Sequence, residues 1–302
     1  MPFLQLTVPI GAADPEPFEA ALLDAGAVSI TLEDAGDDPV LEPAPGTTPL
    51  WPTIRIKALF EASEDRENLT RHLKSTDLEW PTLQFEVIED RPWEREWLKD
   101  FKPMLFGHRL WVCPDGQRPP SERQPPPLNP QPVFLDLDPG LAFGTGTHPT
   151  TRLCLEWLDA AELRGVDVID YGCGSGILAV AALKLGAKSA LAIDIDDQAL
   201  TATLENAARN MVQDRLQVHA VSSMRQRPAQ ILLANILAEP LLQLAEQLAS
   251  LVLPHGSIVL SGLLQSQAAE VASRYEPWFH IAPVSLCDGW ARLDGRRREL
   301  SH

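Results

Sequence analysis

Short apolar runs alternate with helix-like segments over most of the chain after Val133. The runs that we expect to form buried strands are Val166–Tyr171, Ala190–Ile195, Gln230–Asn235 and Ser257–Ser261. Helical patterns lie between them, as in Ile177–Leu185 and Gln198–Asn210. Strands that alternate with helices in this way are typical of a parallel sheet covered by helices on both faces. We therefore expect a doubly wound, mostly parallel α/β domain over residues 133–295.

The first part of the chain, residues 1–91, shows a different order of elements. Strand-like segments occur at Phe3–Val8, Ala27–Leu32, Thr53–Leu59 and Gln84–Ile88. A helical segment that starts near Asp14 and another over Asp65–Leu73 complete the series. The order strand–helix–strand–strand–helix–strand predicts a smaller, ferredoxin-like α+β domain. Such domains have many unrelated functions, so this pattern alone indicates none.

Acidic side chains are concentrated in the same part of the chain. Residues 1–100 hold 21 of the 42 acidic side chains but only 8 of the 25 basic ones, and the whole chain has a net charge of −17. An acidic surface repels phosphate backbones and attracts basic partners. We expect no direct nucleic-acid binding, and a basic, lysine-rich protein as partner. The alternative is that this charge only keeps the protein soluble.

Residues 92–132 are predicted to be a linker. Trp93 and Trp97 are four residues apart and would share one helix face, where we expect them to act as packing anchors. The following stretch, residues 114–132, contains eight prolines in nineteen positions. Because proline disrupts packed helices and central strands, we expect an exposed, semi-extended loop there.

A glycine-rich turn follows the first predicted strand of the larger domain. Asp170 precedes Gly172, Gly174 and Gly176, and a helical pattern follows them. Glycines in such a turn let a ligand approach the backbone closely. The nicotinamide fingerprint requires a glycine at position 177, which is isoleucine. The spacing resembles motif I of S-adenosylmethionine-dependent methyltransferases, in which Asp170 would suit a cofactor with an ammonium group, although a generic tight turn has the same composition.

Two polar side chains stand at the ends of later strands, where ligands bind in doubly wound folds. Asp194 lies 22 residues after Gly172 and could accept hydrogen bonds from both hydroxyls of a ribose. Its neighbour Asp196 is better explained as a helix N-cap. Asn235 could hold a cofactor or accept from an amine, and the alternative is again a helix N-cap.

The remaining candidates are in the loop around His148. Pro149 suits the first turn of a helix, which places the hydroxyl of Thr151 near that helix N-terminus. We expect the lone His148 to be structural, and we predict no metal site because no residues have metal-ligand spacing. The four cysteines contain no C-x-x-C pair, and no apolar run is long enough to span a bilayer. Together with an N-terminus that lacks a secretory signal, these features predict a cytoplasmic protein.

Several segments together resemble the PrmA family, the bacterial methyltransferases of large-subunit ribosomal protein number eleven. The segments that carry this resemblance are Trp93–Trp97, Phe101–Met104, Leu137–Thr151, Asp170–Gly176, Ala192–Asp196 and Ala234–Ala238. The resemblance extends from the N-terminus to about Leu293. The segment Leu137–Thr151 is its longest and most specific part, whereas the proline-rich loop departs from the family pattern.

The resemblance implies a recognition domain, a linker and a Rossmann-like class I methyltransferase domain. It implies that S-adenosylmethionine donates methyl groups to lysine side-chain and N-terminal amines of the ribosomal protein. The cofactor contacts that it implies are Thr151, Gly172, Asp194 and Asn235. No general base is evident, and we expect a monomer. The basic tail Arg296–Arg298 should be a frayed end.

Three alternatives remain open at this stage. The chain could be a lysine methyltransferase that acts on another protein, or a non-catalytic ribosome-assembly factor that retains the cofactor fold. The third is a nicotinamide oxidoreductase, against which Ile177 argues.

Overall fold

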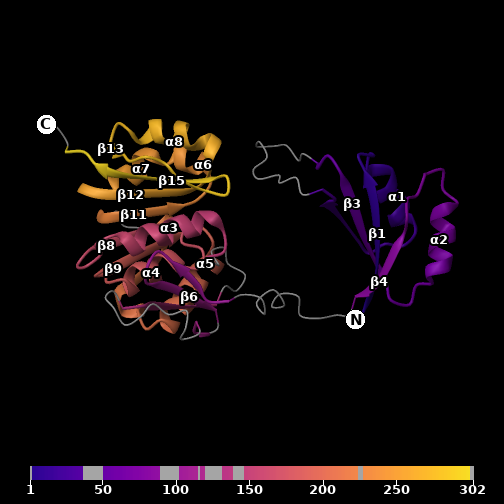
Figure 1. The fold of residues 1–302 in the computed structure, drawn as a ribbon, viewed down its shortest axis with the longest axis horizontal. Coiled ribbons are helices and arrows are strands. Elements are labelled where there is room, and N and C mark those ends of the chain that lie inside the picture. Colours follow the sequence, from indigo (N-terminus) through magenta and orange to yellow (C-terminus); the bar gives the residue numbers. More distant parts are fainter. Residues whose placement is uncertain are drawn as a thin grey trace. The chain divides into compact units, whose positions relative to one another are not determined.

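The computed structural model describes residues 2–36, 50–88, 102–114, 116–119, 131–138, 146–223 and 227–299. The chain divides into two compact units, Met1–Trp93 and Glu94–His302, which are drawn as ribbons in Figure 1. The predicted linker helix around Trp93 and most of the proline-rich loop lie outside the described residues. The linker boundaries at 92 and 132 stay predictions.

The first unit is an antiparallel sheet accompanied by helices. Its elements are β1 (Phe3–Gly11), α1 (Glu16–Asp24), β2 (Ser29–Asp34), β3 (Ile54–Glu61), α2 (Arg66–Lys74) and β4 (Gln84–Ile88). The strands lie in the order β2-β3-β1-β4. This succession of elements is the one that the sequence predicts, and the assignment to the ferredoxin-like class stays a prediction.

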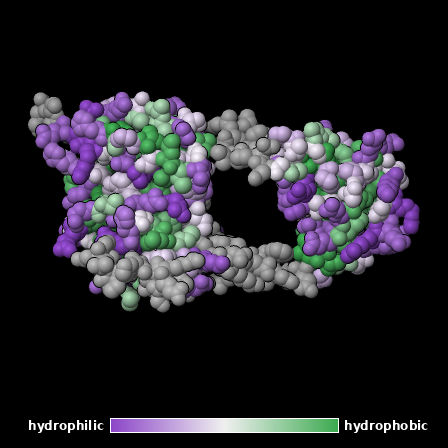
Figure 2. All heavy atoms as spheres, in the orientation of Figure 1, coloured by the Kyte–Doolittle hydropathy of each residue, from purple (hydrophilic) through white to green (hydrophobic). Residues whose placement is uncertain are grey.

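The core of the first unit follows from the alternation of apolar residues along its strands. Every second residue of β1 and β3 is buried, and those side chains pack with Leu22 of α1 and with Leu69 and Leu73 of α2. The α2 helix begins after Asp65, whose carboxylate accepts from the backbone N–H of Glu67. The polar residues between the buried ones face outward, and polar side chains cover much of the visible face of each unit in Figure 2.

The second unit contains the doubly wound sheet. Its parallel strands are β8 (Asp167–Tyr171), β9 (Ser189–Asp194), β10 (Leu216–Ala220), β11 (Ala229–Asn235) and β12 (Val252–Leu264). At one edge, β13 (Phe279–Ile281), β14 (Ser285–Cys287) and β15 (Trp290–Arg297) are antiparallel. The order is β10-β9-β8-β11-β12-β15-β13, with β14 paired to β15. The predicted doubly wound, mostly parallel α/β sheet is confirmed.

Helices cover both faces of this sheet (Figure 1). The helices are α3 (Pro149–Ala160), α4 (Ile177–Lys184), α5 (Asp197–Arg209), α6 (Ala238–Gln243), α7 (Ala245–Ser250) and α8 (Ala268–Tyr275), and 3₁₀ turns occur at Gln213–Arg215, Val221–Ser223 and Gln265–Gln267. One buried apolar cluster joins the sheet to α3, α4 and α5, and another joins it to α6, α7 and α8. None of the described helices has the length and apolar character needed to cross a lipid bilayer.

Part of the predicted linker belongs to the second unit. β5 (Met104–Phe106) and β6 (Leu110–Pro114) pair with each other, and β6 lies parallel to β7 (Val133–Leu137). β6 is buried along its whole length and packs into the core beside α3 and α4. The buried carboxylate of Asp159 accepts from the backbone N–H of His108 at 2.6 Å, which ties the turn between β5 and β6 to α3.

The expectation of a frayed basic tail is wrong. Arg296 and Arg297 are the last residues of β15, where they pair with β13. Arg298 donates its backbone N–H to Trp278 O at 2.9 Å and its side-chain Nε–H to Phe279 O at 3.2 Å. Sheet pairing therefore orders residues that composition alone predicted to be solvated.

Candidate active site

A cavity of about 630 Å³ lies at the carboxyl ends of β8, β9 and β11. The chain continues from β8 to β9 on one side and returns to β11 on the other, so the strand order changes direction here. Ligands of doubly wound sheets bind at this kind of position. The cavity is lined by residues at the ends of these strands or directly after them, including Gly172, Gly174, Asp194, Ile195, Asn235 and Ile236. The cavity therefore combines three of the four predicted cofactor contacts.

The glycine turn is held from two sides. Gly172, Gly174 and Gly176 all have positive φ angles, of 77°, 53° and 76°, which glycine adopts without a steric penalty. The N–H of Gly172 donates to Ile193 O of β9 at 2.8 Å. From α5, Thr203 Oγ1 donates to Gly174 O at 3.1 Å. The turn is thus fixed before any ligand arrives.

Asp194 lines the cavity and also braces the glycine turn. Its Oδ2 accepts from the N–H of Gly174 at 2.9 Å, and its Oδ1 accepts from the N–H of Ile195 at 2.7 Å. A carboxylate oxygen can accept more than one hydrogen bond, so hydroxyl groups of a ligand can still bind there. Asp196 caps α5 by accepting from Gln198 N at 2.9 Å, as the sequence predicts.

Asp170 lies beneath the turn and not in the cavity wall. It is fully buried, and its Oδ2 accepts from Ala179 N at 2.9 Å. Its Oδ1 has no hydrogen-bond partner among the described residues. Burial raises the pKa of Asp170 to about 7, against the opposing effect of the Ala179 hydrogen bond and with a smaller upward contribution from the charge of Asp194. Any effect of Asp170 on a ligand in the cavity would therefore be electrostatic.

Asn235 ends β11 and lines the cavity, and the alternative that it caps a helix is wrong. The next helix, α6, begins at Ala238 after Leu237, and no side chain caps it. Asn235 Nδ2 donates to Thr151 Oγ1 at 3.3 Å, while its Oδ1 has no partner among the described residues. Thr151 is buried behind Asn235. Its expected direct contact with the cofactor stays a prediction, and Thr150 lines the cavity in its place.

His148 and Trp290 form an aromatic wall of the cavity. His148 caps α3 by accepting from Thr150 N, and its ring centroid lies 4.7 Å from that of Trp290 in an edge-to-face arrangement. Burial lowers the pKa of His148, which favours its neutral form. Sequence reasoning missed Trp290. The sequence signal for this region was the Asp288-Gly289 dipeptide, which is typical of a tight hairpin turn before a strand. Both residues have the positive φ angles that such a turn requires.

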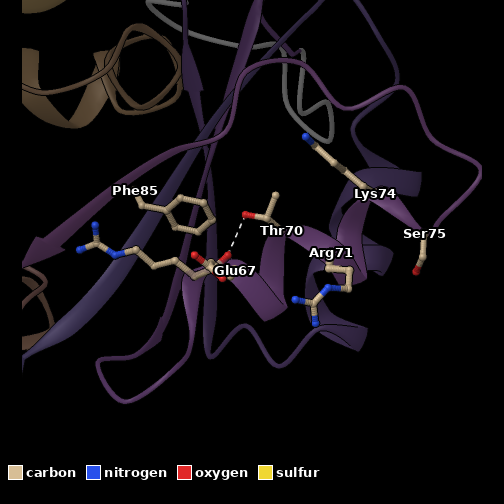
Figure 3. Close-up of a pocket in the computed structure, with 7 residues that line it drawn as sticks. Glu67, Thr70, Arg71, Lys74, Ser75 and Phe85 are labelled. Carbon is tan, nitrogen blue, oxygen red and sulfur yellow. Dashed lines mark hydrogen bonds between the residues drawn. The ribbon is translucent and has the colours of Figure 1, made fainter.

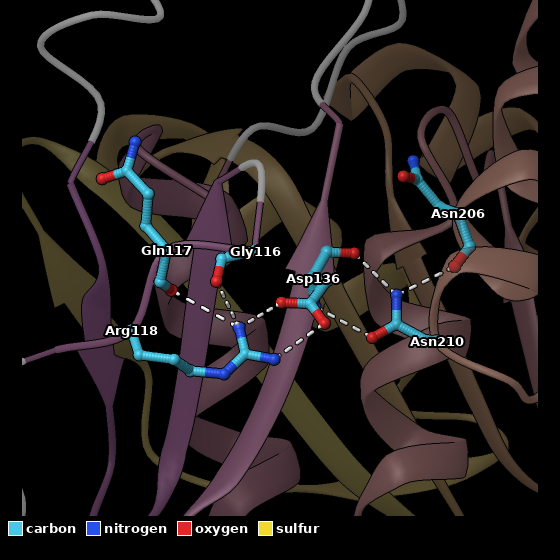
Figure 4. Close-up of polar contacts among 6 residues, drawn as sticks. All are labelled: Gly116, Gln117, Arg118, Asp136, Asn206 and Asn210. Carbon is cyan, nitrogen blue, oxygen red and sulfur yellow. Dashed lines mark hydrogen bonds and ion pairs between the residues drawn. The ribbon is translucent and has the colours of Figure 1, made fainter.

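The amide side chains of Asn206 in α5 and of Asn210, which caps the end of α5, connect the glycine turn to β7 and the residue after it. Asn210 accepts from Asp136 N at 2.9 Å and donates to Asp136 O at 2.6 Å (Figure 4). One turn earlier, Asn206 accepts from Asp138 N at 3.0 Å and donates to Ser175 O at 2.9 Å. The carboxylate of Asp136 forms an ion pair with Arg118. Residues 139–145, which follow β7 and belong to the family motif, lie outside the described residues.

A second hollow, on the first unit, contains none of the predicted site residues. Thr70 of α2 and Phe85 of β4 lie on its two sides, with Arg71 and Lys74 further along the helix (Figure 3). It is shallow and open, and it carries no arrangement of catalytic groups. Within the described ranges, no group of three histidine, cysteine or carboxylate side chains could hold a metal ion.

Comparison with known proteins determines the family. The model of the family described as ribosomal protein L11 methyltransferase (PrmA) matches residues 2–298. The chain belongs to the PrmA family. A PrmA relative from Pseudomonas putida strain W619, named ribosomal protein L11 methyltransferase, is 50% identical over 300 residues, which cover 99% of this chain and 100% of the relative.

Two further members of the PrmA family agree with this assignment. The relative of the same name from Azotobacter vinelandii is 51% identical, with the same coverage of both chains. A solved structure of ribosomal protein L11 methylase from Lactobacillus delbrueckii subsp. bulgaricus is 32% identical. It has a TM-score of 0.56 and covers 66% of this chain and 99% of its own. The resemblance seen in the sequence motifs is thereby confirmed.

Proposed function

We propose that the protein transfers methyl groups from S-adenosylmethionine to lysine side-chain and N-terminal amines of ribosomal protein L11. The observation that supports this most directly is the cavity at the strand-order reversal, which combines a glycine turn, a carboxylate and an amide in a chain of the PrmA family. The relatives are named as methyltransferases of ribosomal protein L11.

The residues of the cavity fit this cofactor. Asp194 can accept hydrogen bonds from the ribose hydroxyls. The absence of side chains at Gly172 and Gly174 allows close approach of the amino-acid part, and Ile195 and Leu237 offer apolar surface for the base. The bound cofactor supplies an electrophilic methyl group on a positively charged sulfur. Asp170, buried beneath the glycine turn, adds a negative charge near this site when it is ionised, although its burial raises its pKa to about 7.

The chain must bind a neutral amine close to that methyl group. A free lysine has a pKa near ~10.4 and arrives protonated. The wall formed by Trp290, neutral His148 and Ile236 is poorly solvated, and this disfavours the charged ammonium form. Asn235 lines the cavity, and we propose that its amide side chain orients the amine nitrogen.

No general base is evident among the described residues that line the cavity. Asp194 is the only carboxylate among the described residues that line the cavity, and backbone N–H groups already bind both of its oxygens. We propose that proximity and orientation supply most of the rate, since aligned intramolecular reactions gain ~7–11 kcal/mol in this way.

Intact mass spectrometry of purified L11, incubated with the protein with and without S-adenosylmethionine, tests the proposal. We expect a ladder of methyl-mass increments that requires the cofactor, and peptide mapping then gives the modified amines. If S-adenosylhomocysteine binds but L11 gains no mass, the substrate proposal is wrong. Methylation of other basic proteins would then favour the lysine methyltransferase alternative, and its absence would favour the assembly factor.

We also infer that the first unit recognises the basic substrate, and that the protein acts as a cytoplasmic monomer without contacting nucleic acid. The support is the charge of residues 1–100, which hold half of the acidic side chains of the chain. An electrostatic contact predicts that KM for L11 rises with salt while KM for the cofactor does not. Light scattering of the purified protein tests the monomer.

A further inference from the structure

We propose that Gly262 is a positioning residue for methyl transfer, because its missing side chain lets β12 hold the main chain of Ile236, directly after Asn235, at the edge of the cavity. The inference rests on the proposed function, in which Asn235 orients the amine. Gly262 is absent from the motifs that the sequence analysis singled out, yet it lines the cavity.

Gly262 lies in a β-bulge. The pairing of β11 with β12 ends at Asn235 and Ser261, and the pairing of β12 with β15 shifts register between Leu260 and Leu263. Gly262 has a φ of 87° at this irregularity. Bulges bend a strand and occur frequently next to active sites, where they redirect neighbouring groups.

The bulge brings two backbones into contact. A Cβ atom on residue 262 would lie 2.3 Å from Ile236 O, 2.7 Å from its carbonyl carbon and 2.9 Å from its N. All three atoms belong to the main chain, so no rotation of a side chain can relieve the overlap. Any residue other than glycine must therefore push the main chain of Ile236, which follows Asn235 directly, away from β12.

The glycine turn limits movement on the other side of Ile236. A Cβ atom on Gly172 would lie 2.3 Å from Ile236 Cγ2, so that side chain already fills the space beside the turn. Ile236 is thus held between two glycines from different strands, Gly172 after β8 and Gly262 within β12. The stacking of Gly262, Ile236 and Gly172 fixes where β11 ends, and with it the direction of the Asn235 side chain.

The size of the displacement determines its effect. Ordinary contact of a Cβ atom begins at about 3.4 Å, so an alanine at position 262 requires the Ile236 carbonyl to move by roughly 1 Å. A misplacement of ~1 Å can reduce the rate of an oriented reaction about 100-fold. The Asn235–Thr151 hydrogen bond, already 3.3 Å long, would be stretched or lost by the same movement.

The competing explanation is that glycine is required at position 262 only because the backbone there has a positive φ angle. Gly165 separates the two explanations, since it has a similar φ of 77° but no atom within 4 Å of an added Cβ. Gly165→Ala therefore introduces similar backbone strain without any contact. It lies between α3 and β8, and it is not part of the cavity.

The experiment compares Gly262→Ala, Gly165→Ala, Asn235→Ala and the double variant Gly262→Ala/Asn235→Ala in the full chain. Methylation of L11 gives kcat and KM, calorimetry gives the affinity for S-adenosylhomocysteine, and thermal unfolding gives Tm. We expect both glycine variants to have lower Tm values. Gly262→Ala should lower kcat at least 10-fold, Gly165→Ala should stay within 2-fold of wild type, and the double variant should be no slower than Asn235→Ala.

Two results would overturn the proposal. One is a Gly262→Ala variant with wild-type kcat and wild-type affinity for S-adenosylhomocysteine. The other is a double variant whose loss is the product of the two single losses, because independent effects multiply. If the wild type does not methylate L11, the proposed function fails, and the affinities for S-adenosylhomocysteine still show whether Gly262→Ala disturbs the cavity and Gly165→Ala does not.

Discussion

Asn235 Nδ2 donates a hydrogen bond of 3.3 Å to the buried hydroxyl of Thr151, which joins the end of β11 to the first turn of α3. Because Asn235 lies between Thr151 and the cavity, Thr151 can act through Asn235 without touching the cofactor. If Thr151 orients Asn235, its loss should change kcat, whereas the loss of a direct cofactor contact should change KM for S-adenosylmethionine.

Thr151→Val removes the hydroxyl and keeps the shape of the side chain. If Thr151 orients Asn235, we expect kcat to fall about 2- to 10-fold, since a lost hydrogen bond costs ~0.5–1.5 kcal/mol. KM for S-adenosylmethionine should stay near wild type. Thr151→Ser, which keeps the hydroxyl, is the matched control. A rise in KM with unchanged kcat would instead support the direct cofactor contact that the family resemblance implies.

Asp194→Ala should weaken cofactor binding by roughly 1–3 kcal/mol, because it removes the acceptors for hydroxyl groups and leaves the N–H of Gly174 unpaired. Calorimetry with S-adenosylhomocysteine measures the loss. Asp194→Asn keeps one acceptor oxygen and should have intermediate affinity. Unchanged affinity in both variants would mean that the ribose binds elsewhere.

Asp170 should make the stability of the second unit depend on pH. Burial raises its folded-state pKa to about 7 from an ordinary value of 3.8, so between these values the folded protein retains a proton that the unfolded chain has lost. Stability from this group is therefore fully present below about pH 4 and is lost as pH rises towards 7, at up to ~1.4 kcal/mol per pH unit.

Urea unfolding of wild type and Asp170→Asn between pH 4 and 8 tests this prediction. The difference in free energy of unfolding, variant minus wild type, should increase as pH rises to 7. Above pH 7 this difference should be constant. A constant difference across the whole range would show that the carboxyl group of Asp170 titrates normally.

Asn206→Ala should destabilise the second unit by roughly 2 kcal/mol or more. The variant removes the hydrogen bonds of Asn206 to the N–H of Asp138 and to the carbonyl of Ser175, which contribute ~0.5–1.5 kcal/mol each, and it replaces a buried amide by a smaller side chain. Glu205→Ala, at the exposed neighbouring position of the same helix, is the control for helix propensity. Equal urea midpoints for the two variants would contradict the prediction.

Local sequence patterns were sufficient to predict those features whose structure is specified by a single continuous segment. The glycine turn, the strand before it and Asp194 could be predicted because they follow one another along the chain. The position of Asn235 could also be predicted from the sequence, since the end of a parallel strand is a defined place in this fold.

Features that depend on distant segments could not be predicted in this way. β6 is an exception, because its continuous apolar run Leu110–Cys113 is the pattern of a buried strand and was overlooked within the predicted linker. Gly262 was missed because its requirement for glycine comes from Ile236, on another strand. The end of β15 was predicted to be frayed because it is rich in arginine, whereas pairing with β13 orders it.

The way in which α5 holds β7 has an evolutionary consequence. The amides of Asn206 and Asn210 bind main-chain N–H and C=O groups of Asp136 and Asp138, which every residue except proline provides. Mutations along β7 that spare its inward apolar side chains should therefore accumulate neutrally, while substitutions of the two asparagines should be eliminated by selection. A deep mutational scan would show this as a tolerant strand facing an intolerant helix.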